Sequence, residues 1–524
     1  MNLLGARATP WLALALGAAC SLSFAPAGLY LLGTACIAGL FWTWESASAR
    51  RAALYGFAWG VGLFLAGAYW IFTAVYVFGR APAWLALLLL LGLVAIMAAW
   101  YALLGWAVVR LTPRSGPLRW LVVAPAAWVL VEWARGWVLS GFPWLQAGYA
   151  HIDSPLSGLA PVGGVHLVGL AAALTAGGVL AAILGTARQR ASALLVLAVT
   201  WVVAAALQGR AWTAVAGDAM EVAVVQGAVP QDLKWDAAHR RQTLELYQGL
   251  NREALGARLI VWPEAALPML ADQAMPFLTS VWRESVRAGS HLMIGLLRYD
   301  ANQDQVYNGL IALGDEDPAW YYKRRLVPFG EFFPVPATVR RWMRLMSLAY
   351  SDLTPGPASQ PALRVAGQRV GVTICYEDAY GAEQLAVLDE ATLLVNVTNN
   401  AWFGDSNAPH QQLEMARFRA LEAGRYLVRA TSNGISAVIG PEGGLRARAE
   451  QFVPVVLRAE VRPHTGLTPY ARVGNGPILL LCLLGLMAAL FRSQLSRRRR
   501  LYGSRADPSS SAANSAGPRA TKAS

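Results

Sequence analysis

Eight long apolar stretches constrain this chain more than any other feature. Seven of them fill the first 210 residues, at 10–25, 27–45, 52–76, 83–110, 119–138, 162–185 and 191–208, and the eighth lies at 476–491. Most have the roughly 20 residues that a helix needs to cross a bilayer core. The first is short enough for a signal peptide, but another apolar stretch follows it at once, so we interpret it as a retained span. The sequence therefore predicts a multi-pass bundle of eight transmembrane helices.

The pattern changes between 211 and 474, where charges, turns and short β-branched runs replace the long apolar stretches. Strands are predicted at 220–229, 257–267, 290–299, 305–313, 368–380 and 391–403, and amphipathic helices at 236–255 and 409–427. This alternation favours an α/β layered domain with buried sheets, in which functional side chains tend to lie at strand ends. We therefore divide the chain into a seven-span region (1–210), a soluble domain (211–474), an eighth span (475–493) and a basic tail predicted to be disordered (494–524).

The distribution of arginine predicts the orientation of the chain. Although the net charge is +13, the basic residues flank the apolar stretches or lie in the tail, which argues against a nucleic-acid partner. The loops after the second, fourth and sixth spans are rich in Arg, whereas the loop at 139–162 has neither Lys nor Arg. Basic loops stay in the cytoplasm, so we expect both termini there and the soluble domain on the outer side of the membrane.

Only one of the four cysteines belongs to the soluble domain. Cys20, Cys36 and Cys482 lie in predicted spans, where a cysteine usually packs as a small apolar residue. Cys375 ends the apolar run "GVTIC" and has no partner in its domain, although an oxidising compartment usually pairs cysteines. Cys375 is therefore either buried and inert or a reactive thiolate.

Two further polar residues stand at the ends of apolar runs. Glu264 follows "LIVWP", and Lys323 lies in "WYYKRRLVPFGEFFP". Each of the three residues also has an ordinary structural interpretation. Glu264 would be a carboxylate in a turn, Lys323 a solvated surface cation and Cys375 a thiol packed in the core. Lys323 is unusual because only three of the 44 basic residues are Lys, and Lys titrates readily when buried whereas Arg does not.

Together the three side chains form a chemical set. A thiol attacks as thiolate, a carboxylate can take its proton, and an ammonium stabilises both the thiolate and the oxyanion that forms after attack. The backbone N–H of Tyr376, directly after Cys375, is placed to donate to that oxyanion. We expect the sheet to fix Cys375 and the following turn to expose its sulfur.

The motifs "WPEAALP", "YYKRRLVPFGEFFP" and "ICYEDAY" resemble, in order and spacing, the Glu, Lys and Cys motifs of the nitrilase superfamily. The segments "VQGAVPQDLKW" and "TNNAWFGDSNAPHQQ" and the eight spans narrow the resemblance to the apolipoprotein N-acyltransferase family of Gram-negative bacteria. It implies a nitrilase-like αββα sandwich for the soluble domain, a place in the bacterial inner membrane, and a periplasmic catalytic domain. No metal or cofactor motif is present, so neither is expected.

The resemblance also implies a reaction. An acyl chain would pass from a membrane phospholipid to Cys375 as a thioester, and then to the α-amine of the diacylglyceryl-cysteine at the N-terminus of a lipoprotein. In the family's roles Glu264 is the general base, Lys323 stabilises the charged intermediates and Cys375 is the nucleophile. The partners would be a phospholipid donor and a diacylated lipoprotein acceptor.

Five other residues match supporting positions of the family. Glu331 matches an acid that helps to hold the Lys, and Glu377 an acid just behind the nucleophile. Trp235, Asn308 and Tyr376 match residues that line the substrate site. For Trp235, ordinary packing is an equally favoured interpretation.

Two aromatic segments outside the spans agree with lipid substrates. The segment 332–350 is long, apolar and studded with Arg, which suits an amphipathic arm at a bilayer surface better than a loop in water. The loop at 140–155 is expected to dock against the soluble domain.

Two other functions fit parts of the sequence. A membrane-tethered amidase or nitrilase would use the same three residues to hydrolyse a carbon–nitrogen bond, but it would need neither eight spans nor an apolar arm. A transporter with an external sensor domain would carry ionisable residues within its spans. Glu132 and Arg135, one turn apart in the fifth span, are the main candidates, and we interpret them as a structural pair.

Overall fold

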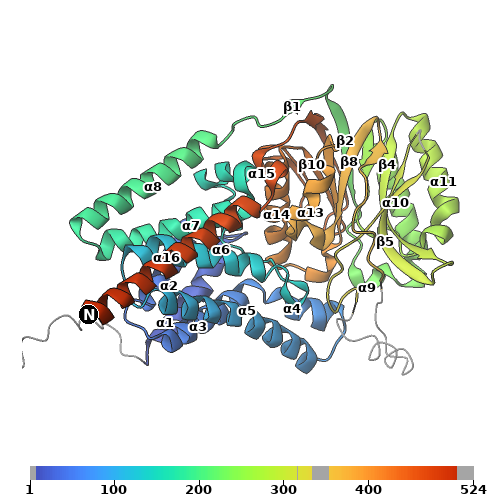
Figure 1. Cartoon of the computed structure of the whole chain (residues 1–524). Helices are drawn as coiled ribbons and strands as arrows, with labels where there is room; N and C mark the ends of the chain where they lie inside the picture. Colours follow the sequence, from blue (N-terminus) through green and yellow to red (C-terminus); the bar gives the residue numbers. More distant parts are fainter. Residues whose placement is uncertain (1–6, 315–316, 333–352, 504–524) are drawn as a thin grey trace, which may run out of the picture.

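The structure, a computed structural model, describes residues 7–314, 317–332 and 353–503 (Figure 1). An all-helical part lies on the left of Figure 1, and a part that contains two large sheets lies on the right. The chain builds most of the helical part first, then the sheets, and returns to the helical part with its last helix.

The helical part agrees with the predicted apolar bundle. Its helices are α1 (Thr9–Cys20), α2 (Tyr30–Thr43), α3 (Ala49–Gly67), α4 (Trp70–Thr73), α5 (Ala83–Leu111), α6 (Ala124–Ala134), α7 (Ala160–Leu184), α8 (Ala187–Leu207) and α16 (Gly476–Gly503). Three helical segments are long and apolar enough to cross a membrane, namely Ala83–Leu111, Pro155–Leu184 and Ala187–Leu207. The pair Ala49–Gly67 and Trp70–Phe78, bent by 50°, would make a fourth span. The count of eight spans therefore stays a prediction.

Small residues let these helices approach closely. A Cβ on Gly17 of α1 would lie 1.9 Å from the backbone oxygen of Trp59 in α3. A Cβ on Gly56 of α3 would lie 2.1 Å from the backbone oxygen of Tyr101 in α5. Close backbone approach through glycine is typical of helix packing inside membranes. Glu132 and Arg135 are buried together, with 3.9 Å between their charged groups, which supports the structural-pair interpretation.

The other part contains two six-stranded sheets. The first has the order β13 (Val455–Val461), β2 (Met220–Gln226), β3 (Leu259–Val261), β4 (His291–Asp300), β5 (Gln305–Leu313) and β6 (Ala319–Tyr322). The second has the order β12 (Leu445–Arg448), β11 (Ala437–Ile439), β10 (Leu427–Thr431), β9 (Leu393–Thr398), β8 (Gln368–Ile374) and β7 (Leu363–Val365). The central strands β2, β3 and β4 are parallel, as are β8, β9 and β10, whereas the outer pairs are antiparallel.

Alternating side chains build the core of this part. Val222 and Val224 of β2 share one buried cluster with Val372 of β8 and Val395 of β9, so the two sheets pack face to face. Ala223 and its alternate neighbours on β2 face the other way. Helices α10 (Arg240–Ala254) and α11 (Ala271–Arg287) cover that outer face of the first sheet, and α14 (Ala408–Ala423) covers the second. Shorter elements are β1 (Ala214–Val215), β14 (His464–Thr465), α9 (Gln231–Lys234), α13 (Gly381–Gln384) and α15 (Pro469–Val473).

Four of the predicted strands are shorter than expected. The runs 220–229 and 391–403 contribute only β2 and β9, and the other two stop early for local reasons. The run 257–267 contributes only β3, because Pro263 has no N–H to continue the ladder. The run 368–380 ends as β8 at Ile374, and the next five residues form a 3₁₀ turn.

The predicted arm and the predicted tail lie largely outside the residues that the structure describes. The arm predicted at 332–350 lies, except for Phe332, outside the described residues. Helix α16 continues to Gly503, past the predicted end of the eighth span at 493. Residues 504–524 of the predicted tail lie outside the described residues.

The loop at 140–155 docks against the sheet-containing part, as predicted. The hydroxyl of Tyr376 donates to the backbone oxygen of Gly141 at 3.1 Å. The indole N–H of Trp144 donates to Oε1 of Gln411 on α14 at 2.6 Å. This loop therefore joins the helical part to the turn that carries Cys375.

Candidate active site

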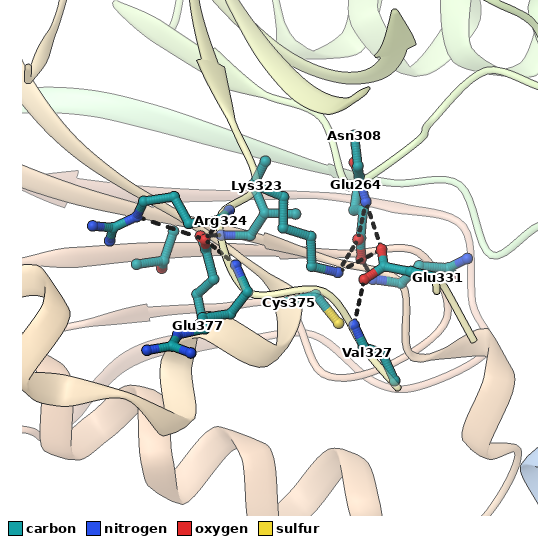
Figure 2. A network of polar contacts seen from close by, with 12 residues as sticks. Glu264, Asn308, Lys323, Arg324, Val327, Glu331, Cys375 and Glu377 are labelled. Carbon is teal, nitrogen blue, oxygen red and sulfur yellow. Dashed lines mark hydrogen bonds and ion pairs between the residues drawn. The ribbon is translucent and has the colours of Figure 1, made fainter. Parts of the chain in front are cut away.

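Three strand ends from two sheets meet in one buried cluster. Glu264 follows β3 and Lys323 follows β6, both in the first sheet, whereas Cys375 follows β8 in the second. Figure 2 shows their side chains converging in the space between these elements. The structure thus brings together the carboxylate, ammonium and thiol that the sequence placed at the ends of apolar runs.

Lys323 is the centre of the cluster. Its Nζ donates to Oε1 of Glu264 at 3.0 Å and to Oε1 of Glu331 at 2.7 Å, and the side chain is only 1% exposed (Figure 2). Burial opposes the charge, but the two carboxylates outweigh it and raise the pKa of Lys323 well above its ordinary value. Lys323 is therefore a buried ammonium, and its interpretation as a solvated surface cation is wrong.

Glu264 is held as a carboxylate by three donors. Besides Lys323, its Oε1 accepts from Nδ2 of Asn308 at 2.6 Å, and its Oε2 accepts from the backbone N–H of Asn399 at 2.7 Å. Burial alone would raise the pKa of Glu264, but the ammonium and these hydrogen bonds lower it below its ordinary value. Gly295 packs against this segment, since a Cβ there would lie 2.7 Å from the Cα of Glu264.

Glu331 and Asn308 complete the polar network around the ammonium. Oε1 of Glu331 accepts from Nδ2 of Asn308 at 3.0 Å, and its Oε2 accepts from the backbone N–H of Val327 at 2.8 Å. Glu331 and Glu264 thus share both the Lys323 ammonium and the Asn308 amide as donors. The predicted role of Glu331 in holding the Lys stays a prediction. Oδ1 of Asn308 has no hydrogen-bond partner within the described residues, and its assignment to substrate binding stays a prediction.

Cys375 adopts a strained backbone conformation at the end of β8. Its φ is 54°, in the left-handed region that a residue with a Cβ rarely enters, and its carbonyl accepts from Nε2 of Gln412 at 3.0 Å. The side chain is 8% exposed, so the expectation that the turn exposes the sulfur is wrong. Figure 2 shows the sulfur on the side of the turn that faces the Lys323 and Glu331 side chains.

The thiol is protonated at rest. Burial, and after it the negative charge of Glu264, raise the pKa of Cys375 to about 12, although the positive charge of Lys323 opposes both. Since the pKa of Glu264 is lowered while that of the thiol is raised, the resting pair is a carboxylate and a neutral thiol. A neutral thiol can attack only if a base within the site takes its proton, and Glu264 has the charge for that predicted role.

Glu377 fixes the turn behind the thiol. Its Oε2 accepts from the backbone N–H of Ile374 at 2.8 Å and from the hydroxyl of Tyr321 at 3.0 Å. Its Oε1 accepts from the backbone N–H groups of Arg324 at 2.6 Å and Arg325 at 3.3 Å. One buried carboxylate therefore ties the segment that carries the thiol to the segment that carries the ammonium (Figure 2).

Two other predicted site residues lie apart from this network. The hydroxyl of Tyr376 points to the loop of the helical part, where its ring lies 6.5 Å from that of Trp144, centroid to centroid. Trp235, at the end of α9, is 48% exposed, which excludes ordinary core packing. The predicted role of both residues at the substrate site stays a prediction.

Three residues around the site were missed by the sequence analysis. The backbone N–H of Asn399 donates to Glu264, and the side-chain amide of Gln412 donates to the backbone oxygen of Cys375. Both residues lie in the segment "TNNAWFGDSNAPHQQ", which the sequence analysis used only for its resemblance to the family. Lys234 is 2% exposed, and its Nζ has no hydrogen-bond partner within the described residues. The scarcity of Lys in this chain was a signal for Lys234 as much as for Lys323.

Comparison with known proteins covers nearly the whole chain. Residues 16–178 match the family model "Apolipoprotein N-acyltransferase N-terminal domain", and residues 221–470 match "Carbon-nitrogen hydrolase". An apolipoprotein N-acyltransferase of Methylococcus capsulatus is 41% identical over 93% of this chain and 96% of its own length. One of Pseudomonas putida is 40% identical over 93% of this chain and 97% of its own length. The chain therefore belongs to the apolipoprotein N-acyltransferase family, whose catalytic part is a nitrilase-like carbon–nitrogen hydrolase domain.

Proposed function

We propose that this protein transfers an acyl chain from a membrane phospholipid to the N-terminal α-amine of diacylglyceryl-cysteine in apolipoproteins. The observation that carries the proposal is the buried cluster of Glu264, Lys323 and Cys375 in a chain whose full-length relatives are named apolipoprotein N-acyltransferases. The apolar helices supply the membrane attachment that two lipid substrates require.

In the first step Cys375 takes the acyl chain. Glu264 accepts the thiol proton, and the sulfur attacks the ester carbonyl carbon of the donor. The oxyanion that forms is stabilised by Lys323, which lies at the strand end beside both groups. When the tetrahedral intermediate collapses, the carbon–oxygen bond of the ester breaks. The leaving lyso-phospholipid oxygen then takes the proton back from Glu264, and an acyl thioester remains on the enzyme.

In the second step the lipoprotein amine replaces the sulfur. A free α-amine has a pKa near ~8, so a fraction is neutral at neutral pH and can attack the thioester carbon. Glu264 takes a proton from the attacking nitrogen, the carbon–sulfur bond breaks, and the proton passes to the departing sulfur. The amide forms without a nucleotide because the thioester already holds the acyl group in reactive form.

The architecture that goes with this function is part of the proposal. Eight spans, an αββα sandwich, cytoplasmic termini and a periplasmic catalytic domain in the inner membrane would place the cluster beside the outer leaflet. The loop that docks through Gly141 and Trp144 supports such a placement, since it ties the catalytic turn to the helical part.

The alternative is a membrane-tethered amidase. It would form the same kind of thioester, but water would hydrolyse the thioester in the second step. Relatives that carry the acyltransferase name cover both the helical part and the catalytic part of this chain, which favours transfer to an amine. A thioester that waits for an amine must resist water, and the 8% exposure of Cys375 agrees with that demand.

The test is to trap the intermediate. Purified protein mixed with phospholipid alone should release lyso-phospholipid in about one equivalent and gain the acyl mass on the peptide that contains Cys375. Cys375→Ala should do neither, and Glu264→Gln should keep the thiol but acylate it scarcely. If lyso-phospholipid appears only when the acceptor is present and no acyl-Cys375 is found, direct transfer replaces the covalent route.

A further inference from the structure

A second buried ammonium lies at the site without an acceptor. Lys234 is 2% exposed, and its Nζ has no hydrogen-bond partner within residues 7–314, 317–332 and 353–503. Buried ammonium groups are strongly unfavourable unless they are paired, so nearly all of them have an acceptor. The described part of the chain does not supply one, which indicates that the acceptor comes with a ligand.

Lys234 belongs to the wall of the catalytic cluster. It ends α9, whose residue Gln231 accepts a hydrogen bond from Nδ2 of Asn399 at 3.1 Å. The backbone N–H of Asn399 in turn donates to Oε2 of Glu264 at 2.7 Å. Trp235, the next residue along the chain, is 48% exposed. Helix α9, which carries Lys234, is thus linked to Glu264 through Gln231 and Asn399, and the residue that follows Lys234 is half-exposed.

The charges of the cluster leave Lys234 free for an anion from outside. The Lys323 ammonium already lies between the carboxylates of Glu264 and Glu331, and Glu264 has two further donors. Burial lowers the pKa of Lys234 to about 8, against the opposing charge of Glu264. An arriving anion would stabilise the charged form and remove the cost of burying an unpaired ammonium.

We propose that Lys234 binds the phosphate group of the lipid acyl donor. This inference rests on the proposed function, in which a phospholipid ester reaches Cys375. The phosphate of such a lipid lies only a few covalent bonds from the ester that the thiol attacks, whereas a neutral glyceride and the lipoprotein acceptor lack it. Lys234 is therefore a specificity residue for the acylation step and not for the transfer step.

The experiment compares two donors that differ only in the phosphate. Detergent micelles carry either phosphatidic acid or the diacylglycerol with the same acyl chains, and acylation of Cys375 is followed by mass for each. The wild type should prefer the phospholipid, and Lys234→Met should lower this preference by about 30-fold, as expected when one partner of a buried charge pair is removed. Lys234→Arg, which keeps the charge, should recover part of the preference.

Controls separate a phosphate contact from a folding defect. Arg241→Met removes a 90% exposed cation on α10 and should leave the preference unchanged. The ratio between two donors is measured on the same sample, so a partly unfolded variant lowers both rates and not the ratio. Transfer from pre-formed acyl-enzyme to the amine should fall far less in Lys234→Met than acylation by phospholipid does.

Two results would overturn the inference. The first is an unchanged donor ratio in Lys234→Met. The second is an equal loss in acylation and transfer, which would indicate a structural role. Inhibition of the diacylglycerol reaction by millimolar inorganic phosphate in the wild type but not in Lys234→Met would support a phosphate contact at Lys234. If the wild type forms no acyl-Cys375 from either lipid, the proposed function itself fails, and that result is distinct from these.

Discussion

At the scale of single residues, the site depends on which side chains are charged before a substrate binds. Glu264 has a lowered pKa and Cys375 a raised one, so the proton stays on sulfur until a substrate arrives. Lys323 makes this arrangement possible, because it compensates two carboxylates that would otherwise repel one another within a buried space. Three side chains that look ordinary alone thus form one charged cluster, on which the proposed reactivity depends.

Replacing Lys323 by Arg should abolish most activity although the charge is kept. The ammonium lies between Glu264 and Glu331 at 1% exposure, and the larger planar guanidinium does not fit the same two contacts. A displacement of about 1 Å at a reacting centre can cost about 100-fold in rate, and we expect a loss of this order. Acyl-enzyme formation measures it, with thermal unfolding as the control for folding. Near-normal turnover would show that only charge matters there.

The acylation rate should not fall when the pH is lowered from neutral toward the ordinary pKa of Glu. Glu264 must be a carboxylate to take the thiol proton, and its pKa is lowered, so the base is fully present above the ordinary Glu value of about 4.3. Activity should be lost only as the pH falls through the lowered pKa. Burst acylation measured against pH checks this, with tryptophan fluorescence to identify acid unfolding. An acidic limb near pH 6 in folded protein would contradict it.

At the scale of elements, the site is made at the ends of strands and fixed by the turns that follow. The sequence showed Glu264, Lys323 and Cys375 at the ends of apolar runs. It did not show where the strands end, since the strands predicted to reach 267 and 380 stop at Val261 and Ile374, and no strand was predicted before Lys323. It did not predict that the turn buries the sulfur. The positive φ of Cys375, the bond from Gln412 to the Cys375 carbonyl and the bond from the Ile374 N–H to Glu377 arise only in the folded turn. The pattern of apolar and polar residues within one segment does not predict contacts between residues of two different sheets.

Replacing Glu377 by Gln should loosen the turn behind the thiol. The carboxylate accepts four hydrogen bonds, two of them from Ile374 and Tyr321, and an amide nitrogen in place of one oxygen can accept none. We expect a loss of about 1–3 kcal/mol in the free energy of unfolding and a larger fall in acylation than in lipid binding. Denaturant unfolding and burst kinetics measure the two effects.

A matched control for that variant exists on the surface. Glu390→Gln removes the same charge from a half-exposed pair with Arg369 that is 4.0 Å long, and such pairs contribute little. If both variants behave alike, the buried contacts of Glu377 do not hold the turn.

At the scale of the whole molecule, the catalytic part and the helical part share polar contacts as well as apolar ones. Gln411 of α14 accepts from Trp144 and donates to the backbone oxygen of Gly67 at the end of α3 at 3.1 Å. The buried amide of Gln411 thus connects α14 with the loop at 140–155 and with the end of α3. The predicted docking of the loop at 140–155 was correct because its aromatic residues needed a covering surface. The involvement of α3 could not be predicted, since nothing in the sequence of α3 marks its end as a contact.

Replacing Gln411 by Leu should weaken the junction between the two parts. Two buried polar groups, on Trp144 and Gly67, would lose their partners, which destabilises by about 1–3 kcal/mol each. Thermal unfolding in detergent should shift to lower temperature, and acylation by bilayer lipid should fall more than acylation by a short soluble ester. Gln242→Leu, on the exposed side of α10, is the control. Equal losses on both substrates would indicate a defect within the catalytic part instead.

The predicted orientation is open to direct labelling. The native cysteines within the described residues are buried, so a reporter cysteine dominates the signal in a mild reaction. Asn302→Cys, in the exposed turn between β4 and β5, should react with an impermeant reagent added to intact cells, whereas Ser115→Cys near Arg114 should not. Labelling of the second position alone would reverse the assignment.

The strand order has a consequence for the newborn chain. The first sheet is incomplete until β13 pairs with β2, and β13 is made only after all six strands of the second sheet. The carboxylate and the ammonium belong to the early sheet and the thiol to the late one, so a partly synthesised chain holds no working site. Under the proposed function, acylation of Cys375 therefore has to wait until the late strands of the chain have been made and both sheets are complete.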